Sequence, residues 1–372
     1  MSDFVGRYYR RKAWKIEAQL LTPLFLGGAQ QSAEWRAAPF KSLLRYWWRL
    51  TRGPGTPWET LLQDESRLFG SAGEQGGEGG QSLVRVGVSA SNSPKKDKLP
   101  TCSPITHPEI YSQDPNKNQK VDPLLYLAGM GLLKPSLEVI ESRSYFQVGS
   151  LFTLIVDCSQ KEEADLRKTF AFIQAFGALG SRCRNGWGSF AVRDGGLSRD
   201  EAVGYLEQFT YPWKKGFEQD HPTCLGRDDN GLLLWKTRSP RNTWEEAMRD
   251  LADAYAGLRA RTEGGIGPLD ADGNSDPGER HLLGFPLTNH PAESKSNQGW
   301  GRDGRHASPL RFVVRRHPTG FVGFVLHVPY RFSDNMTKNI NALQPDKQLA
   351  IWEKVHQKLD HLLDRAGYEE CL

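Results

Sequence analysis

The chain has 372 residues, of which 38% are hydrophobic and 25% are charged. This balance is typical of folded globular proteins, and the length is enough for two domains. We place the domain boundary at residue 200, which gives domains 1–200 and 201–372. The formal net charge is only +4, so an anion site must come from a local concentration of basic residues. No apolar run is long enough to cross a bilayer, which predicts no membrane partner.

The cysteines and histidines give no sign of a metal or a nucleophile. Five cysteines are spread over the chain without a Cys-x-x-Cys pair. This favours reduced thiols in a cytoplasmic protein, with neither a disulfide framework nor a zinc site. The nine histidines include no His-Glu-x-x-His motif, and there is no Gly-x-Ser-x-Gly motif. We therefore predict no cofactor, no bound metal and no catalytic residue.

The first half has the element order strand, helix, strand, strand, helix, strand. This order is typical of ferredoxin-like domains and of the RRM modules that bind RNA. The apolar periodicity predicts helices at 40–51, 58–69 and 162–176. It predicts strands at 14–21, 82–89, 137–143 and 151–157, and a last strand that ends at Val192. The Gly-rich run 70–81 and the Pro-rich run 91–123 are predicted to be long mobile loops.

The predicted helix 40–51 carries the strongest local signal for function. One face is apolar, and the other carries cations three or four residues apart, which places them in a row: Lys41, Arg45, Arg49 and Arg52. No acidic residue occurs between positions 35 and 58, and residues 1–52 hold ten Lys and Arg against three Asp and Glu. We predict an unpartnered basic face for a polyanion. The plain alternative is a solvated face on a helix that packs on the core.

A second signal is the segment 177–188, which we call the Gly-rich loop. Its four glycines and Asn185 permit left-handed backbone, which can expose amide groups as a nest for phosphate. Arg182 and Arg184 add charge. The pattern matches neither a Walker loop nor the dinucleotide motif. The plain alternative is a helix end at Gly177 followed by a tight turn.

Three tryptophans stand among arginines in these two segments. They are Trp47 and Trp48 in the predicted helix and Trp187 in the Gly-rich loop. Aromatic side chains beside cations are typical of surfaces on which RNA bases stack. Most tryptophans of a globular protein belong to the core, so stacking on bases is the less common role.

The second half is predicted to be a degenerate ferredoxin-like unit. Its expected elements are a strand at 232–236, a helix at 243–261, a hairpin of 310–315 and 321–328, and a helix at 342–366. No strand is visible after the last helix. Loose stretches cover 263–279 and 288–308. The acidic run 270–276 departs from an EF-hand, with Ser275 and His281 where glycine and glutamate are needed, so we predict a hydrophilic loop there, with weak ion binding as the less common alternative.

Several motifs resemble one family. Leu-Thr-Pro-Leu-Phe-Leu-Gly-Gly at 21–28, Glu-Trp-Arg at 34–36, the helix from Phe40, the Gly-rich loop and Ala-Ser-Pro-Leu at 307–310 are similar to RAMP proteins of CRISPR systems. The resemblance is specifically to the Cmr-one subunits of type III-B effector complexes. That family usually has glycine where this chain has Ser42.

The resemblance implies an α+β protein with two ferredoxin-like (RRM-like) domains in tandem, acting as a non-catalytic RNA-binding subunit in antiviral defence. Its partners would be guide RNA, target RNA and a neighbouring RAMP subunit, with contacts near the guide's 3′ region. The expected RNA-binding residues are Arg36, Lys41, Arg45, Arg49, Arg52, Gly180, Arg182, Arg184, Asn185, Gly186, Trp187 and Gly188.

Two other functions remain open from the sequence. One is a metal-independent endoribonuclease that processes CRISPR precursor RNA, a role that cousins of this fold have. His107 would be its candidate base, although a lone loop histidine is more often solvated. The other is a scaffold that docks subunits without touching RNA.

Overall fold

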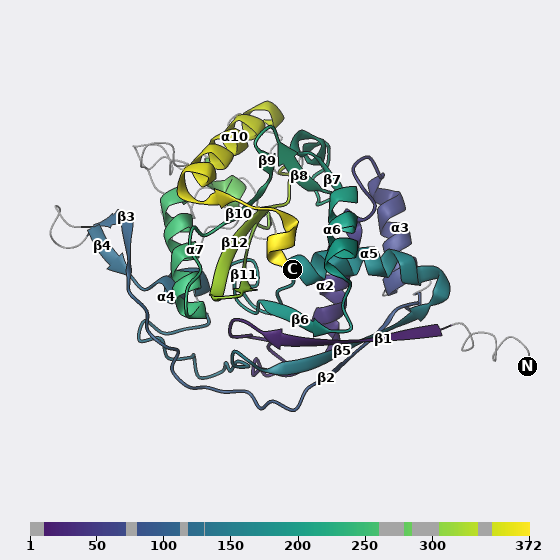
Figure 1. The fold of residues 1–372 in the computed structure, drawn as a ribbon, viewed down its shortest axis with the longest axis horizontal. Coiled ribbons are helices and arrows are strands. Elements are labelled where there is room, and N and C mark those ends of the chain that lie inside the picture. Colours follow the sequence, from purple (N-terminus) through teal and green to yellow (C-terminus); the bar gives the residue numbers. More distant parts are fainter. Residues whose placement is uncertain are drawn as a thin grey trace, which may run out of the picture.

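The computed structural model has two four-stranded antiparallel sheets, one from each half of the chain (Figure 1). It describes residues 11–71, 80–111, 118–129, 131–259, 279–284, 305–333 and 344–372. The protein is therefore a mixed α+β protein, as the sequence predicts. Within the described residues, no helix is both long and apolar enough to span a membrane.

The first sheet lies across the lower part of Figure 1, with helices on one face. Its strands, in spatial order, are β2 (Arg85–Ser89), β5 (Leu151–Ser159), β1 (Arg11–Leu20) and β6 (Phe190–Asp194), all paired antiparallel. The helices are α2 (Ala37–Leu50) and α5 (Gln160–Phe176). Ile16, Ala18 and Leu20 of β1 are buried, because alternate side chains of a strand share one face. The predicted strand 14–21 and helices 40–51 and 162–176 are confirmed.

The second sheet repeats the connectivity of the first. Its elements in chain order are β10 (Leu234–Lys236), α7 (Trp244–Arg259), β11 (Leu310–His317), β12 (Gly320–His327), α10 (Pro345–Leu362) and β13 (Asp364–Arg365). The spatial order is β11-β12-β10-β13, with antiparallel pairs throughout. The strand β13, which the sequence does not reveal, lies after the last helix. It has only two residues, too few for a periodic pattern.

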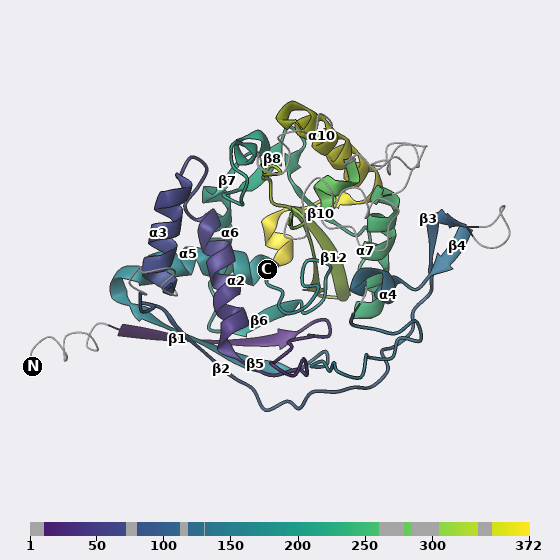
Figure 2. The same ribbon diagram turned by 180° about the vertical axis from the view of Figure 1, so that it is seen from behind.

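The remaining elements connect or flank the two sheets (Figures 1 and 2). They are α3 (Trp58–Phe69), β3 (Ile105–Tyr111), β4 (Asn118–Val121), α4 (Pro123–Ala128), α6 (Arg199–Gln208), β7 (Thr210–Pro212), η1 (Trp213–Glu218), β8 (Leu225–Asp228), β9 (Gly231–Leu232), η2 (Glu279–Leu283) and η4 (Tyr368–Cys371). The β3–β4 hairpin extends away from the main body in both views.

Two expectations about the first half are wrong. The segment 137–143 is not a strand: it contains turns and a single bridge between Leu133 and Val139. The Pro-rich run 91–123 is not loop throughout, because it contains β3, β4 and the first residue of α4. Of the loops predicted at 70–81, 263–279 and 288–308, most residues lie outside the described part of the chain.

The Gly-rich loop joins the two sheets. The Phe312 amide of β11 donates to the Arg184 carbonyl over 2.8 Å, and the Val314 amide donates to the Ser189 hydroxyl over 3.0 Å. Asn185 and Phe312 form a parallel bridge. The loop is thus held from both sides, and this fixes the position of the site described below.

A buried histidine pair lies in the second half. His327 Nδ1 and His356 Nε2 are 2.8 Å apart, and the His327 ring stacks on Trp352 with centroids 4.0 Å apart. Burial lowers the pKa of His356 to about 4, and burial and the charge of His356 lower the pKa of His327 well below its usual value. Both rings therefore resist protonation in the folded protein.

This pair predicts loss of stability in mild acid. Unfolded histidine titrates near pH 6.5, so the unfolded chain binds more protons below that pH and the fold loses up to about 1.4 kcal/mol per histidine per pH unit. The urea midpoint should fall between pH 7 and pH 5, and it should fall less in His356→Gln. The exposed His317 provides the control, since His317→Gln should keep the parent's slope. Equal slopes in all three proteins would contradict the prediction.

Candidate nucleic-acid interface

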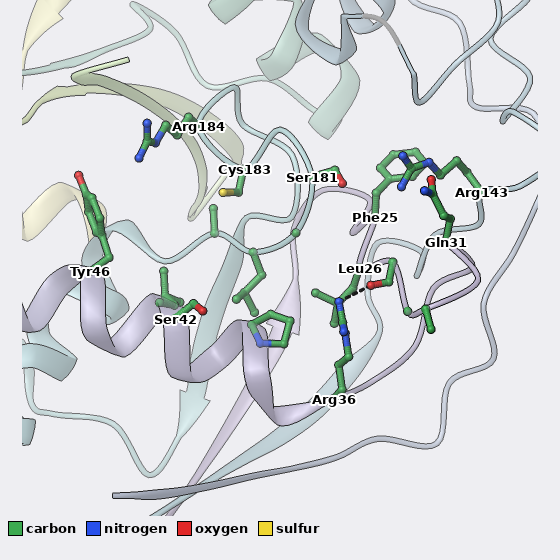
Figure 3. A pocket seen from close by; sticks show the side chains of 18 of the residues that line it. Phe25, Leu26, Gln31, Arg36, Ser42, Tyr46, Arg143, Ser181, Cys183 and Arg184 are labelled. Atoms are coloured by element: carbon green, nitrogen blue, oxygen red, sulfur yellow. Dashed lines mark hydrogen bonds between the residues drawn. The ribbon is translucent and has the colours of Figure 1, made fainter. Parts of the chain in front are cut away.

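A pocket of about 550 Å³ lies beside the N-terminal half of α2. Three segments form its wall: the turn 25–31, the α2 side chains of Pro39, Ser42, Leu43 and Tyr46, and residues 178–184 of the Gly-rich loop. These segments are distant in sequence but share one cavity (Figure 3). The fold thus brings the Gly-Gly turn, the helix and the Gly-rich loop together.

Four arginines line this pocket, which we call the arginine pocket: Arg36, Arg143, Arg184 and Arg311. No Asp or Glu is among the described residues of its wall. Glu34 packs against Gly28 of the turn without lining the cavity. Guanidinium groups favour phosphate and carboxylate oxygens because they offer several donors in one plane. The wall is therefore suited to an anion.

The arginines fall into two pairs at opposite ends of the pocket. Arg36 donates to the Gly27 carbonyl, and Arg143 lies beside the same glycine. At the other end, the Arg311 guanidinium lies 4.6 Å from the centre of the Tyr46 ring, and Arg184 lies 5.8 Å from it. Figure 3 places Arg184 and Tyr46 on one side, and Arg36 and Arg143 towards the other.

The sequence analysis does not identify Arg311 as a binding residue, although Arg311 directly follows the Ala-Ser-Pro-Leu motif. The residue is only 3% exposed, and its Nε atom has no hydrogen-bond partner among the described residues. A buried charge without a counter-charge is costly. The available signal was an arginine inside an apolar strand, and only the fold shows that this strand reaches α2.

The prediction that the basic face of α2 lacks partners is wrong. Arg45 and Arg49 both bind the carboxylate of Glu65 on α3, at 2.7 and 2.5 Å. Arg52 binds Asp165 of α5 at 2.7 Å and lies over the Trp48 ring. These carboxylates lie outside the acid-free stretch of sequence, so the local pattern could not reveal them.

Glu65 sits between its two arginines with a side chain only 2% exposed. Burial raises its pKa, but the hydrogen bonds and charges of Arg49 and Arg45 outweigh this, and the pKa falls below the ordinary glutamate value. The carboxylate therefore stays ionised and joins α3 to α2. Lys41 has no ion pair among the described residues. Its pKa is lowered, mainly by partial burial and to a smaller extent by the positive charge of Arg45.

The glycines of the Gly-rich loop serve close packing of the chain. Gly180, Gly186 and Gly188 all have positive φ. A Cβ on Gly186 would lie 2.6 Å from the Met248 sulfur, and one on Gly188 would lie 2.0 Å from the Leu179 carbonyl oxygen. The side of Gly186 where a Cβ would lie is thus filled by α7 and offers no room for a ligand.

The predicted aromatic stacking surface is also absent. Trp187 is completely buried, and Trp47 and Trp48 are at most 1% exposed. All three belong to the core, so none presents a free ring to a base in this structure. The plain alternative, core packing, is correct for these tryptophans.

Two other loop residues differ in accessibility. Arg182 is exposed with φ of +59°, and its guanidinium lies against Gly129. Asn185 donates its side-chain amide to the Leu127 carbonyl over 2.9 Å, so it is engaged in holding the loop against α4. Arg182 is thus better placed than Asn185 to meet a ligand.

No catalytic or metal constellation appears in the described part of the chain. His107 is buried in β3 beside Tyr126 and not in a mobile loop. Across the described ranges, no group of three His, Cys, Asp or Glu side chains could hold a metal ion. The acidic run 270–276 lies outside the described residues.

Comparison with known proteins finds one family. Residues 17–191 match the RAMP superfamily, and no curated protein matches the chain. Similar solved structures include Cmr1 from Pyrococcus furiosus in the apo form, with 16% identity over 85% of this chain and 87% of that chain and a TM-score of 0.44. A chain of the type III-B Cmr-beta complex bound to cognate target RNA and AMPPnP has 12% identity, 94% and 98% coverage, and a TM-score of 0.45.

A chain of a type IV-B CRISPR complex is similar over 50% of this chain and 94% of its own length, with 12% identity and a TM-score of 0.29. All of these TM-scores are below 0.5, so we base no argument on these structures. The matched region contains most of the first sheet, α2 and the Gly-rich loop. Over residues 17–191, this chain is similar to the RAMP superfamily.

Proposed function

We propose that the protein is a non-catalytic RNA-binding subunit of a type III-B CRISPR ribonucleoprotein effector complex. The observation that carries this proposal is the arginine pocket, where four guanidinium groups and no carboxylate line a cavity beside α2 and the Gly-rich loop. Phosphate is the anion that every RNA presents, whatever its sequence. The match to the RAMP superfamily supports RNA as the source of that phosphate.

The proposal includes the domain plan. Each sheet comes from one side of residue 200, and both have the strand order expected of a ferredoxin-like unit. We therefore assign two tandem ferredoxin-like domains, 1–200 and 201–372. The second is degenerate because its outer strand β13 has two residues.

The RNA-binding residues are chosen first by their place in or beside the arginine pocket. Those in or beside the arginine pocket are the first choice: Arg36, Arg143, Arg182, Arg184 and Arg311. Lys41, Arg45, Arg49 and Arg52 stay as predicted secondary contacts, because their side chains are partly exposed even where a carboxylate neutralises them. Guide and target RNA and a neighbouring RAMP subunit are the proposed partners, with contact near the guide's 3′ region.

A binding experiment with a chemical footprint tests this function. Cys183 lines the arginine pocket and is partly exposed, whereas Cys158, Cys224 and Cys371 are buried. In a Cys102→Ser background, single-stranded RNA should slow alkylation of Cys183, and duplex DNA of the same length should protect it less. RNA binding without any protection of Cys183 would place the site elsewhere.

A cleavage assay distinguishes RNA binding without catalysis from the endoribonuclease alternative. Incubation of labelled CRISPR precursor RNA with the protein in EDTA should return intact RNA, because no histidine, carboxylate or lysine that could act as a general base lines the described wall of the pocket. Discrete products that vanish in His107→Ala would favour the endoribonuclease. Failure to bind any RNA would favour the scaffold.

A further inference from the structure

The arginine pocket is elongated along α2. The residues that line it run from Arg36, at the start of the helix, to Tyr46. Ten residues of α-helix span about 15 Å. A charge-assisted hydrogen bond reaches only about 2.8 Å, so an anion that contacts one end of such a pocket is not in contact with the other.

The guanidinium groups are held at those two ends. Arg36 is fixed by the Gly27 carbonyl and has Arg143 beside the same glycine, so this pair forms one end, which we call the Gly27 end. Arg311 and Arg184 lie over Tyr46 and form the other, the Tyr46 end. Each end therefore offers two guanidinium groups to one anion.

The Tyr46 end has an observation of its own that indicates a ligand. Arg311 is 97% buried with an unpartnered Nε, and it lines the cavity. Arg315, four residues further along the same face of β11, is equally buried but donates to three backbone carbonyls. Among the described residues, the fold therefore provides acceptors for Arg315 but no carboxylate within ion-pair distance of Arg311, which faces the pocket.

The wall offers mainly cationic groups, with few neutral polar side chains that could read a base. Arg311 and Arg184 lie over the Tyr46 ring, and Phe25 is buried. The polar groups that remain, Ser42 and Gln31 among them, are few. A volume of about 550 Å³ is that of a small-ligand pocket, which admits a segment of a single strand and excludes a duplex.

We infer that the arginine pocket contains two phosphate subsites that bind two phosphates of one single-stranded RNA segment, one at the Gly27 end and one at the Tyr46 end. This inference rests on the proposed RNA-binding function and specifies its ligand: two backbone phosphates, without base readout. The second half of the chain contributes Arg311, so the Tyr46 subsite is incomplete without both halves.

The salt dependence of binding reports how many RNA phosphates the protein neutralises. For a single strand, the slope of log K against log salt falls by roughly 0.7 for each phosphate that is neutralised. Anisotropy titrations of the full chain with a labelled single-stranded RNA, at several salt concentrations, should give a slope smaller by about 0.7 in Arg36→Met/Arg143→Met. The same loss of about 0.7 is expected in Arg184→Met/Arg311→Met, and about 1.4 in the quadruple variant.

A matched control removes two exposed arginines outside the pocket, as Arg193→Met/Arg316→Met, and should leave the slope unchanged. A quadruple variant that loses no more than either double variant would mean that the pocket holds one phosphate, and it would overturn the inference. An unchanged slope in all pocket variants, with RNA still bound, would overturn it too. Absence of RNA binding by the parent protein would overturn the proposed function as well. Thermal unfolding of each variant confirms that it is folded.

Discussion

Gly188→Ala is expected to destabilise the protein strongly, with a loss of about 3–5 kcal/mol in the free energy of unfolding. Gly188 has φ of +66°, which already costs an alanine about 1–2 kcal/mol. Its new Cβ would lie 2.0 Å from the Leu179 carbonyl oxygen and 3.0 Å from a Leu24 methyl carbon. Backbone must move to accept it, and a domain has only about 5–15 kcal/mol to lose.

Gly55→Ala is the matched control. Gly55 also has positive φ, +91°, but a Cβ there meets nothing within 4 Å. The Gly55→Ala variant should lose only about 1 kcal/mol in the free energy of unfolding, which is the cost of a positive φ for alanine. Urea unfolding followed by tryptophan fluorescence measures both. Similar losses in the two variants would mean that the contact with Leu179 is unimportant and that the Gly-rich loop is held loosely.

The helix and the Gly-rich loop could be located from sequence because their signals are local. Apolar residues at helical spacing define α2, and four glycines in twelve residues define the loop. The sequence also predicted that both belong to an anion site, and the arginine pocket brings them together. Which face of α2 meets the ligand could not be predicted in this way.

The face depends on residues that are distant in sequence. The cationic row meets Glu65 and Asp165, which lie on α3 and α5, so much of its charge is neutralised. The pocket is lined by another side of α2, with Pro39, Ser42 and Tyr46. Helical periodicity separates apolar from polar faces, but it does not identify the polar face that a neighbouring helix covers.

The last strand and Arg311 were missed for a related reason. The strand β13 has two residues and is defined only by its pairing with β10. The proposed role of Arg311 depends on its contact with Tyr46, which lies 265 positions earlier in the chain, on α2 of the first sheet. Short elements and contacts between halves carry no periodic signal, and a sequence pattern cannot replace the fold there.

Arg315→Met is expected to destabilise the protein by about 3–5 kcal/mol, whereas Arg311→Met should change its stability by less than about 1 kcal/mol. Arg315 donates to Ala175 and Gly177 at the C-terminal end of α5 over 2.7 and 3.2 Å, and to Val314 over 3.0 Å. Its removal leaves buried carbonyl groups without donors, each costing about 1–3 kcal/mol. Burial lowers the pKa of Arg315 to about 10, which shows how fully the group is desolvated.

Arg311→Met removes a buried charge whose Nε has no partner, so the loss of its stacking on Tyr46 and Trp47 is offset by relief of an uncompensated charge. Its RNA affinity should nevertheless fall, because a phosphate contact is lost. Urea midpoints and RNA titrations on the two variants therefore separate a structural arginine from a binding one on the same strand. A strong loss of stability in Arg311→Met would mean that this arginine is structural, and the Tyr46 subsite would then lose its main support.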